Sequence, residues 1–147
     1  MGKKKVRLKP GTIPYSAKIP RIDPGITSPM DLNPVWHIGT LDIEGPWGWN
    51  TITERIFFDE ILPKIRDFES MFWKDIFRRN NHEVEVSQIS ISAQKRLVHL
   101  NLEDTENLVS LRLTGKQRIW GIRVANILRI LWWDPDHEVY PTELRHT

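Results

Sequence analysis

Cysteine does not occur in this chain of 147 residues. Its absence excludes a disulfide scaffold, a zinc site built on thiolates and a cysteine nucleophile. The chain also has no apolar run of the roughly 18 residues that a membrane-spanning helix needs, and its charged N-terminus has no apolar segment typical of a secretory signal. We therefore expect a cytoplasmic protein that makes no contact with a membrane.

Signatures of several enzyme classes are missing as well. The sequence contains no glycine-rich phosphate loop, no G-x-S-x-G elbow and no paired-histidine metal motif. The run Asp134-Pro135-Asp136-His137 has metal-ligand residue types, but without a second cluster it is better explained as a turn in which Asp134 caps backbone amides. We expect neither a metal site nor a small-molecule cofactor.

Acidic residues are absent from the first 22 positions, which contain seven lysines and arginines. Six of the ten prolines lie within residues 1–34, and proline removes backbone donors and disfavours regular structure. The sequence predicts an extended, basic, proline-rich arm over residues 1–33, followed by a single domain over residues 34–147. The arm either contacts a phosphate backbone or only keeps a mobile terminus soluble. The lysines concerned are Lys3, Lys4 and Lys5.

The first part of the predicted domain changes from a strand signal to helix signals. Residues 35–43 alternate like a strand and are followed by turn residues. Residues 51–54 fit a capping box led by Thr51, so a helix should begin there and break at Pro63. A further helix is expected to follow an N-cap at Ser70.

The last part of the chain has the clearest pattern. A short extended piece at 83–86 precedes a predicted helix over 88–100. Three antiparallel strands separated by short turns are expected at residues 108–113, 118–124 and 127–133, with a short fourth beginning at Val139-Tyr140. Such a sheet needs apolar cover, which the helices supply. The predicted fold class is therefore α+β: an N-terminal strand, helices, and then a three- to four-stranded antiparallel meander.

Seven tryptophans are many for a chain of this length. Trp47 and Trp49 flank a glycine in a predicted loop, where they either stack on bases or sugars or close the edge of a core. Trp132 and Trp133 are neighbours on one predicted strand, so they should point to opposite faces. One of them is expected in the core and the other beneath the arm or a partner.

A basic cluster lies in the predicted meander. Alternation puts Arg118 with Trp120 on one face of the central strand and Arg123 on the other, so the arginines cannot all line one site. The cluster forms either a phosphate-binding surface or a solvated face paired with helix carboxylates. It has five basic residues and no acid, namely Arg112, Lys116, Arg118, Arg123 and Arg129.

The residues of this meander resemble a known family. Leu111-Arg112-Leu113, the run 118–123 and the run 126–133 are similar to a basic strand, a W-x-I/L-R strand and an R-I-L/Y strand in the RelE/ParE-like toxin superfamily of bacterial toxin–antitoxin systems. The resemblance covers residues 105–140 well and residues 35–100 only in the order of elements. It implies a RelE-like fold and a small cytoplasmic toxin that a partner antitoxin neutralises. RelE-like members cut messenger RNA at the ribosome, whereas ParE-like members poison DNA gyrase.

The resemblance implies a metal-independent endoribonuclease, an mRNA interferase, as the leading hypothesis. Basic side chains would hold the scissile phosphate, one group would deprotonate the 2′-hydroxyl and another would protonate the leaving 5′-oxygen. His137 and Tyr140 lie near the chain's end, where the family often has such groups, and Lys95 is a further candidate on the predicted helix. The expected catalytic residues are His137, Tyr140, Arg123 and Lys95, and the expected RNA contacts are Arg112, Lys116, Arg118, Arg129 and the three arm lysines.

Two other functions fit the same residues. One is a non-catalytic module that holds nucleic acid or a protein partner through the arm and the sheet. The other is a toxin of the same fold that inhibits a protein target. His37 and His82 have no companion residues in the sequence and receive no role.

Overall fold

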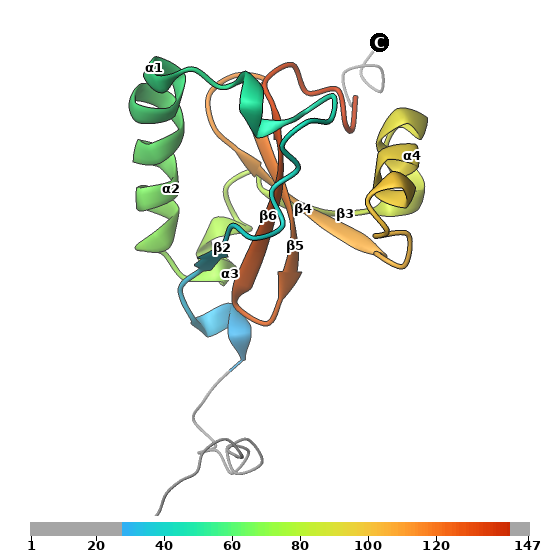
Figure 1. Ribbon diagram of the computed structural model, residues 1–147. Coiled ribbons are helices and arrows are strands. Elements are labelled where there is room, and N and C mark those ends of the chain that lie inside the picture. The colour runs from blue at the N-terminus through green and yellow to red at the C-terminus, as the bar shows by residue number, and fades with distance from the viewer. Residues whose placement is uncertain (1–27, 142–147) are drawn as a thin grey trace, which may run out of the picture.

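The computed structural model describes residues 28–141 (Figure 1). Most of the predicted arm, including its three consecutive lysines, lies outside this range. Residues 28–33 are described, and they pack on the domain. The short turn η2 (Pro29–Asp31) contacts α3 (Trp73–Ile76), and Lys74 Nζ lies 2.9 Å from Asp31 Oδ1.

A five-stranded sheet runs through the domain in the order β2-β6-β5-β4-β3. The strands β3 to β6 pair antiparallel with their neighbours, whereas β2 pairs parallel with β6. The expected α+β class is confirmed, but the sheet is mixed rather than wholly antiparallel. The strands are β2 (Val35–His37), β3 (His82–Glu85), β4 (Asn107–Arg112), β5 (Arg118–Val124) and β6 (Ile127–Asp134).

The predicted strand over residues 35–43 is wrong in its length, because β2 ends at His37. Beyond it the chain becomes a loop that follows β6 through single hydrogen bonds. The amide of Asp42 donates to the carbonyl of Leu131 (2.9 Å), and the amide of Trp133 donates to the carbonyl of Trp47 (3.0 Å). Gly48 is required in this loop, since a Cβ there would lie 2.2 Å from the carbonyl oxygen of Ile43.

The helical segments of the first half differ from the prediction at their ends. Thr53, rather than Thr51, is the N-cap of α1 (Glu54–Ile56), and its Oγ1 accepts from the amide of Ile56 at 3.2 Å. The chain then continues through the π-helical turn η4 (Phe57–Ile61) into α2 (Leu62–Glu69). Pro63 does not break this continuous helical segment, because it lies in the first turn of α2, where its missing amide hydrogen costs little.

Ser70 ends a helix rather than beginning one. It is the C-cap residue of α2, and its Oγ donates to the carbonyl of Asp67 at 2.7 Å. The following helix α3 has Phe72 rather than Ser70 as its N-cap residue. The predicted helix over 88–100 is confirmed as α4 (Ile91–His99), after the turn η5 (Val86–Gln88), and Ser90 Oγ caps it by accepting from the amide of Ala93 at 3.1 Å.

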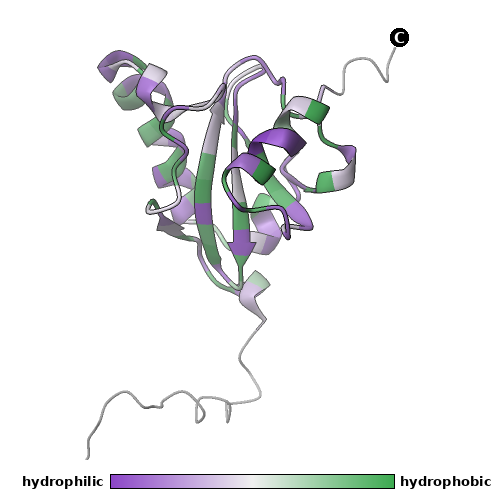
Figure 2. Cartoon of the chain, turned by 45° about the vertical axis from the view of Figure 1, so that its right-hand side comes forward, coloured by the Kyte–Doolittle hydropathy of each residue, from purple (hydrophilic) through white to green (hydrophobic). Residues whose placement is uncertain are grey.

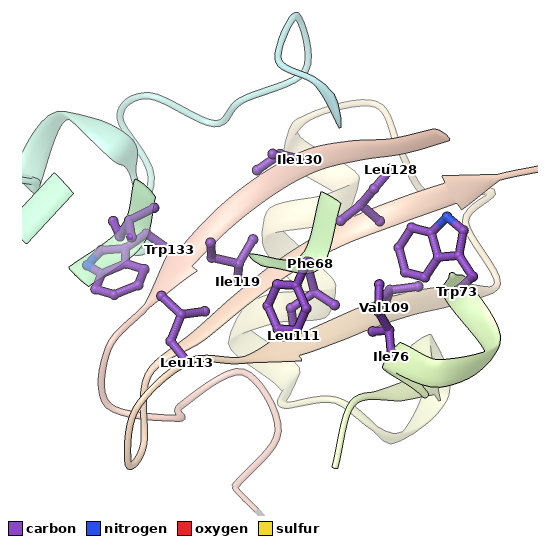
Figure 3. Packing of buried hydrophobic residues seen from close by; sticks show 11 residues of the cluster. Phe68, Trp73, Ile76, Val109, Leu111, Leu113, Ile119, Leu128, Ile130 and Trp133 are labelled. Carbon is purple, nitrogen blue, oxygen red and sulfur yellow. The ribbon is translucent and has the colours of Figure 1, made fainter. Parts of the chain in front are cut away.

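Helices cover both faces of the sheet (Figure 1). On the face that we call the α2 face, Phe68, Trp73 and Ile76 pack against Leu111 and Ile119 of the strands, as Figure 3 shows. The opposite face, the α4 face, has a second core formed by α4, the loop after β2 and residues from β3 to β6. Figure 2 shows hydrophobic residues over much of the central strands, as expected for a sheet that is covered twice.

Trp132 and Trp133 point to opposite faces, as predicted. Both are buried by the domain itself, so the expectation that the arm or a partner covers one of them is wrong. Trp133 belongs to the core on the α2 face. Trp132 belongs to the core on the α4 face, where the ring of Trp47 lies 5.1 Å away. Trp47 therefore closes a core rather than offering a base-stacking surface.

Candidate functional site

A cavity of about 660 Å³ opens beside the antiparallel strands β3, β4 and β5. It is lined by residues of β3, η5, β4 and β5 and by residues of the segment after β6. The polar side chains that matter most are those of His82, Ser110, Arg112, Arg118, His137 and Tyr140. Four of these six are residues for which the sequence predicts a catalytic or RNA-binding role.

The strand register explains why the two arginines meet. Arg112 of β4 lies directly opposite Arg118 of β5, and Arg118 lies opposite Asp134 of β6. The next pair on the same face is Ser110 opposite Trp120, and Trp120 belongs to the core on the α4 face. The arginine pair therefore lies just beyond the end of that core, where the sheet face becomes polar.

Arg118 is held in place by the turn between β4 and β5. Its Nη1 donates to the carbonyls of Gly115 (2.8 Å) and Gln117 (3.0 Å). Gly115 adopts a φ of 58°, which favours glycine at this position. The guanidinium next to Arg112 is thus ordered by backbone carbonyls. Like charges directly opposite each other on a sheet repel, so an anion between them would be favourable.

Asp134 organises the segment that carries His137 and Tyr140. Its side chain is fully buried and accepts from Trp120 Nε1 (3.1 Å) and from the amides of Glu138 (2.8 Å) and Val139 (2.9 Å). This confirms the capping role predicted for Asp134. Burial raises the pKa of Asp134, and these hydrogen bonds together with the charge of His137 offset only part of that rise.

The turn after Asp134 positions the C-terminal side of the cavity. His137 has a φ of 60°, a left-handed conformation that is uncommon outside glycine, and its side chain is largely buried. Val139 is buried in the core on the α4 face, and its carbonyl accepts from the amide of Ser90 at 2.8 Å. The segment is therefore tied to α4. Val139 and Tyr140 do not form the predicted fourth strand of the meander.

The other predicted site residues lie elsewhere in the domain. Arg123 is on the α2 face, 5.9 Å from the ring centroids of both Trp73 and Phe77, and its Nη2 lies 3.4 Å from Glu83 Oε2. Three further residues are absent from the lining of the cavity: Lys95 is exposed on α4, Lys116 is exposed in the turn between β4 and β5, and Arg129 lies on β6 opposite His37 and Ile122. The structure thus separates Arg123, Lys95, Lys116 and Arg129 from the Arg112–Arg118 pair.

Two features of the domain were missed by the sequence analysis. The first is His82, which lines the cavity from the edge strand β3. The signal that would have found it is the register of β3 on β4, in which His82 lies opposite Ser110.

The second is a buried ion pair between Asp42 in the loop after β2 and Arg96 of α4. Asp42 accepts from Arg96 Nε and Nη2 (2.8 Å each), from Trp132 Nε1 (2.9 Å) and from the amide of Gly45 (3.1 Å). Burial opposes the ionisation of Asp42, but the hydrogen bonds from Arg96 and Trp132 and the guanidinium charge outweigh it and lower the pKa of this carboxyl. The pair ties the loop after β2 to α4 and β6.

Within residues 28–141, no group of three or more histidines and carboxylates is placed to hold a metal ion. No helix among these residues is both long and apolar enough to cross a membrane. Comparisons with family models, curated proteins and solved structures gave no match for this chain.

Proposed function

We propose that the cavity beside β3, β4 and β5 binds a phosphodiester of RNA and cleaves it without a metal ion. The observation that carries the proposal is the convergence of Arg112, Arg118, His137 and Tyr140 on one cavity from separate segments of the chain. Arginine pairs bind phosphate well, and imidazole and phenol groups transfer protons. An endoribonuclease is the activity that uses these groups together.

The two arginines act on the phosphate. Their guanidinium groups hold the scissile phosphate and stabilise the extra negative charge that develops when the 2′-oxygen attacks the phosphorus. A bound phosphate also removes the repulsion between Arg112 and Arg118, which lie opposite each other on β4 and β5. The affinity for RNA should therefore fall with increasing salt concentration.

His137 and Tyr140 act on protons and hydrogen bonds at the same phosphate. His137 lies close enough to the buried carboxyl of Asp134 for its charge to affect the pKa of that group, and the imidazolium form of His137 is the one that can donate a proton. In this form His137 donates a proton to the leaving 5′-oxygen, while the phenol of Tyr140 donates a hydrogen bond to the phosphate. The reaction also needs a group that accepts the proton of the 2′-hydroxyl.

A cellular role as the toxin of a toxin–antitoxin pair is part of the proposal. The support for it is the resemblance of residues 105–140 to the RelE/ParE-like toxins. The RNA would then be messenger RNA, bound on the ribosome in the manner of RelE-like members, and the second partner would be an antitoxin protein in the cytoplasm.

The experiment is induced expression of the full chain in bacterial cells, with growth and the integrity of messenger RNA measured in the same cultures. The test variant is Arg112→Ala, since Arg112 is exposed and lines the cavity. The matched control is Arg129→Ala, an arginine of the same sheet outside the cavity. We expect arrest with cleaved messenger RNA for the wild-type chain and the control, and at least a tenfold slower cleavage for Arg112→Ala.

Two results would count against the proposal. Growth arrest with intact messenger RNA would indicate a toxin that inhibits a protein target. Normal growth with intact messenger RNA, at confirmed protein levels, would indicate a non-catalytic binding module.

A further inference from the structure

His82 lines the same cavity as His137 and Tyr140 but comes from a different part of the fold. It lies on the edge strand β3, whereas His137 follows β6, and the sheet order places β4 and β5 between these strands. His82, His137 and the Arg112–Arg118 pair line one cavity of about 660 Å³, which has room for a phosphate group.

Strand alternation fixes the face of β3 to which His82 belongs. Val84 is buried in the core on the α4 face, and His82 lies two residues before it on the same strand, so both side chains point to that face. His82 is paired with Ser110, and Arg112 lies two residues beyond Ser110 on the same face of β4. His82 itself is exposed, so a bound substrate can reach its imidazole.

We propose that His82 is the general base of the reaction, paired with His137 as the general acid. This inference rests on the proposed ribonuclease function. The neutral imidazole of His82 accepts the proton of the 2′-hydroxyl as the 2′-oxygen forms its bond to phosphorus. The bond from phosphorus to the 5′-oxygen breaks, and the 5′-oxygen takes a proton from the imidazolium of His137. The products are a 2′,3′-cyclic phosphate and a 5′-hydroxyl, and the next turnover begins after the two imidazoles exchange these protons with solvent.

An imidazole suits the role of general base better than the phenol of Tyr140. A histidine side chain ordinarily titrates between about pH 5 and 8, whereas a tyrosine titrates near pH 10. The charged and titratable groups that line the cavity with His82 are Glu83, Glu85, Arg112, Arg118, His137 and Tyr140. A smaller cavity on the other side of β3 adds Arg123 beside His82.

The test measures single-turnover cleavage of messenger RNA in a translation mixture that contains ribosomes and the purified full chain. Two RNAs are compared: one is natural, and the other has sulfur in place of the 5′-oxygen at the cleaved linkage. A thiolate leaves without a proton, so this RNA bypasses the general acid but still needs the general base. The variants are His82→Gln and His137→Gln, and the matched control is His37→Gln, an exposed histidine of β2 outside both cavities.

We expect His82→Gln to slow cleavage of both RNAs by about 100-fold or more, and His137→Gln to slow only the natural RNA. The wild-type rate should rise with pH between about 5 and 7, and this rise should disappear in His82→Gln but not in His37→Gln. In His82→Ala, added imidazole should restore part of the rate.

The inference is overturned if His82→Gln cleaves both RNAs within threefold of the wild-type rate with an unchanged pH profile. In that case cleavage by the wild-type chain still supports the proposed function. A wild-type chain that leaves both RNAs intact overturns the proposed function and the role of His82 together.

Discussion

Replacing Asp42 by alanine should destabilise the domain more than replacing any exposed carboxylate. The substitution removes the acceptor of four hydrogen bonds, two of them from Arg96, and leaves a guanidinium and the indole N–H of Trp132 without that acceptor. The side chain of Asp42 is only 2% exposed and that of Arg96 is 19% exposed, so water replaces the lost partner poorly. Glu44, an exposed carboxylate of the same loop, provides the matched control.

The expected loss is about 3 kcal/mol. Removing one partner of a buried ion pair costs roughly 3–5 kcal/mol, and the lower end applies because Arg96 retains some contact with solvent. Arg96→Ala should cost a similar amount, since it leaves the carboxylate of Asp42 buried. The double variant Asp42→Ala/Arg96→Ala should lose about 1–3 kcal/mol less unfolding free energy than the two single variants lose in total, because each single change already breaks the pair.

Urea unfolding at pH 7 measures these differences. For Asp42→Ala, the urea concentration at the unfolding midpoint should fall, with little change in the dependence of the unfolding free energy on urea concentration. The unfolding free energy of Glu44→Ala should stay within about 0.5 kcal/mol of that of the wild-type protein. The folded-state pKa of Asp42 lies below its ordinary value, so its contribution is complete above about pH 4 and declines as the pH falls through the folded-state pKa. An unfolding free energy of Asp42→Ala within about 0.5 kcal/mol of the wild-type value at pH 7 would contradict a stabilising role for the ion pair.

Two further predictions concern Arg123 and Asp134, neither of which lines the cavity. Arg123→Ala should lower the unfolding free energy by about 1–2 kcal/mol, because it loses the contacts with Trp73 and Phe77 and the partly exposed pair with Glu83. The rate of RNA cleavage should stay within about twofold of the wild-type rate. A tenfold loss of cleavage in a folded variant would assign Arg123 a catalytic role. Asp134 has a raised pKa, so the folded state holds its proton more tightly, and wild-type stability should decrease as the pH rises from about 4 through the folded-state pKa. Asp134→Asn should abolish that decrease and lower the unfolding free energy by about 1–3 kcal/mol, because its carboxamide N–H₂ replaces an acceptor that faces buried donors. Urea unfolding with an unchanged pH dependence in Asp134→Asn would contradict the role of Asp134 in that decrease.

The second half of the fold was predictable because its patterns are local. The strands β4, β5 and β6 lie within one residue of the predicted ranges, and α4 lies inside its predicted range. In each, apolar periodicity and turn residues agree. The first half was less predictable, because β2 ends where single hydrogen bonds to β6 replace regular pairing, and because Thr53, which lacks the capping-box pattern of Thr51, caps the helix.

The candidate site was predictable only in part, for reasons of distance along the chain. Arg112 and Arg118 flank a short turn, so antiparallel pairing brings them together by necessity. Whether His137 and Tyr140 join them depends on the buried carboxyl of Asp134, which directs the chain back over the sheet. His82 and the pair of Asp42 with Arg96 depend on contacts between distant segments, and a single sequence has no local signal for those.

The chemistry of the RNA ends left by the purified full chain distinguishes cleavage through the 2′-hydroxyl from other outcomes. Messenger RNA in a translation mixture is cleaved, the reaction is quenched, and the ends are identified with the wild-type chain beside Arg112→Ala and Arg129→Ala. We expect 2′,3′-cyclic phosphate and 5′-hydroxyl ends from the wild-type chain and Arg129→Ala, and at least tenfold fewer from Arg112→Ala. RNA that stays intact, or ends with a 5′-phosphate, would contradict the claim that this cavity cleaves RNA through the 2′-hydroxyl.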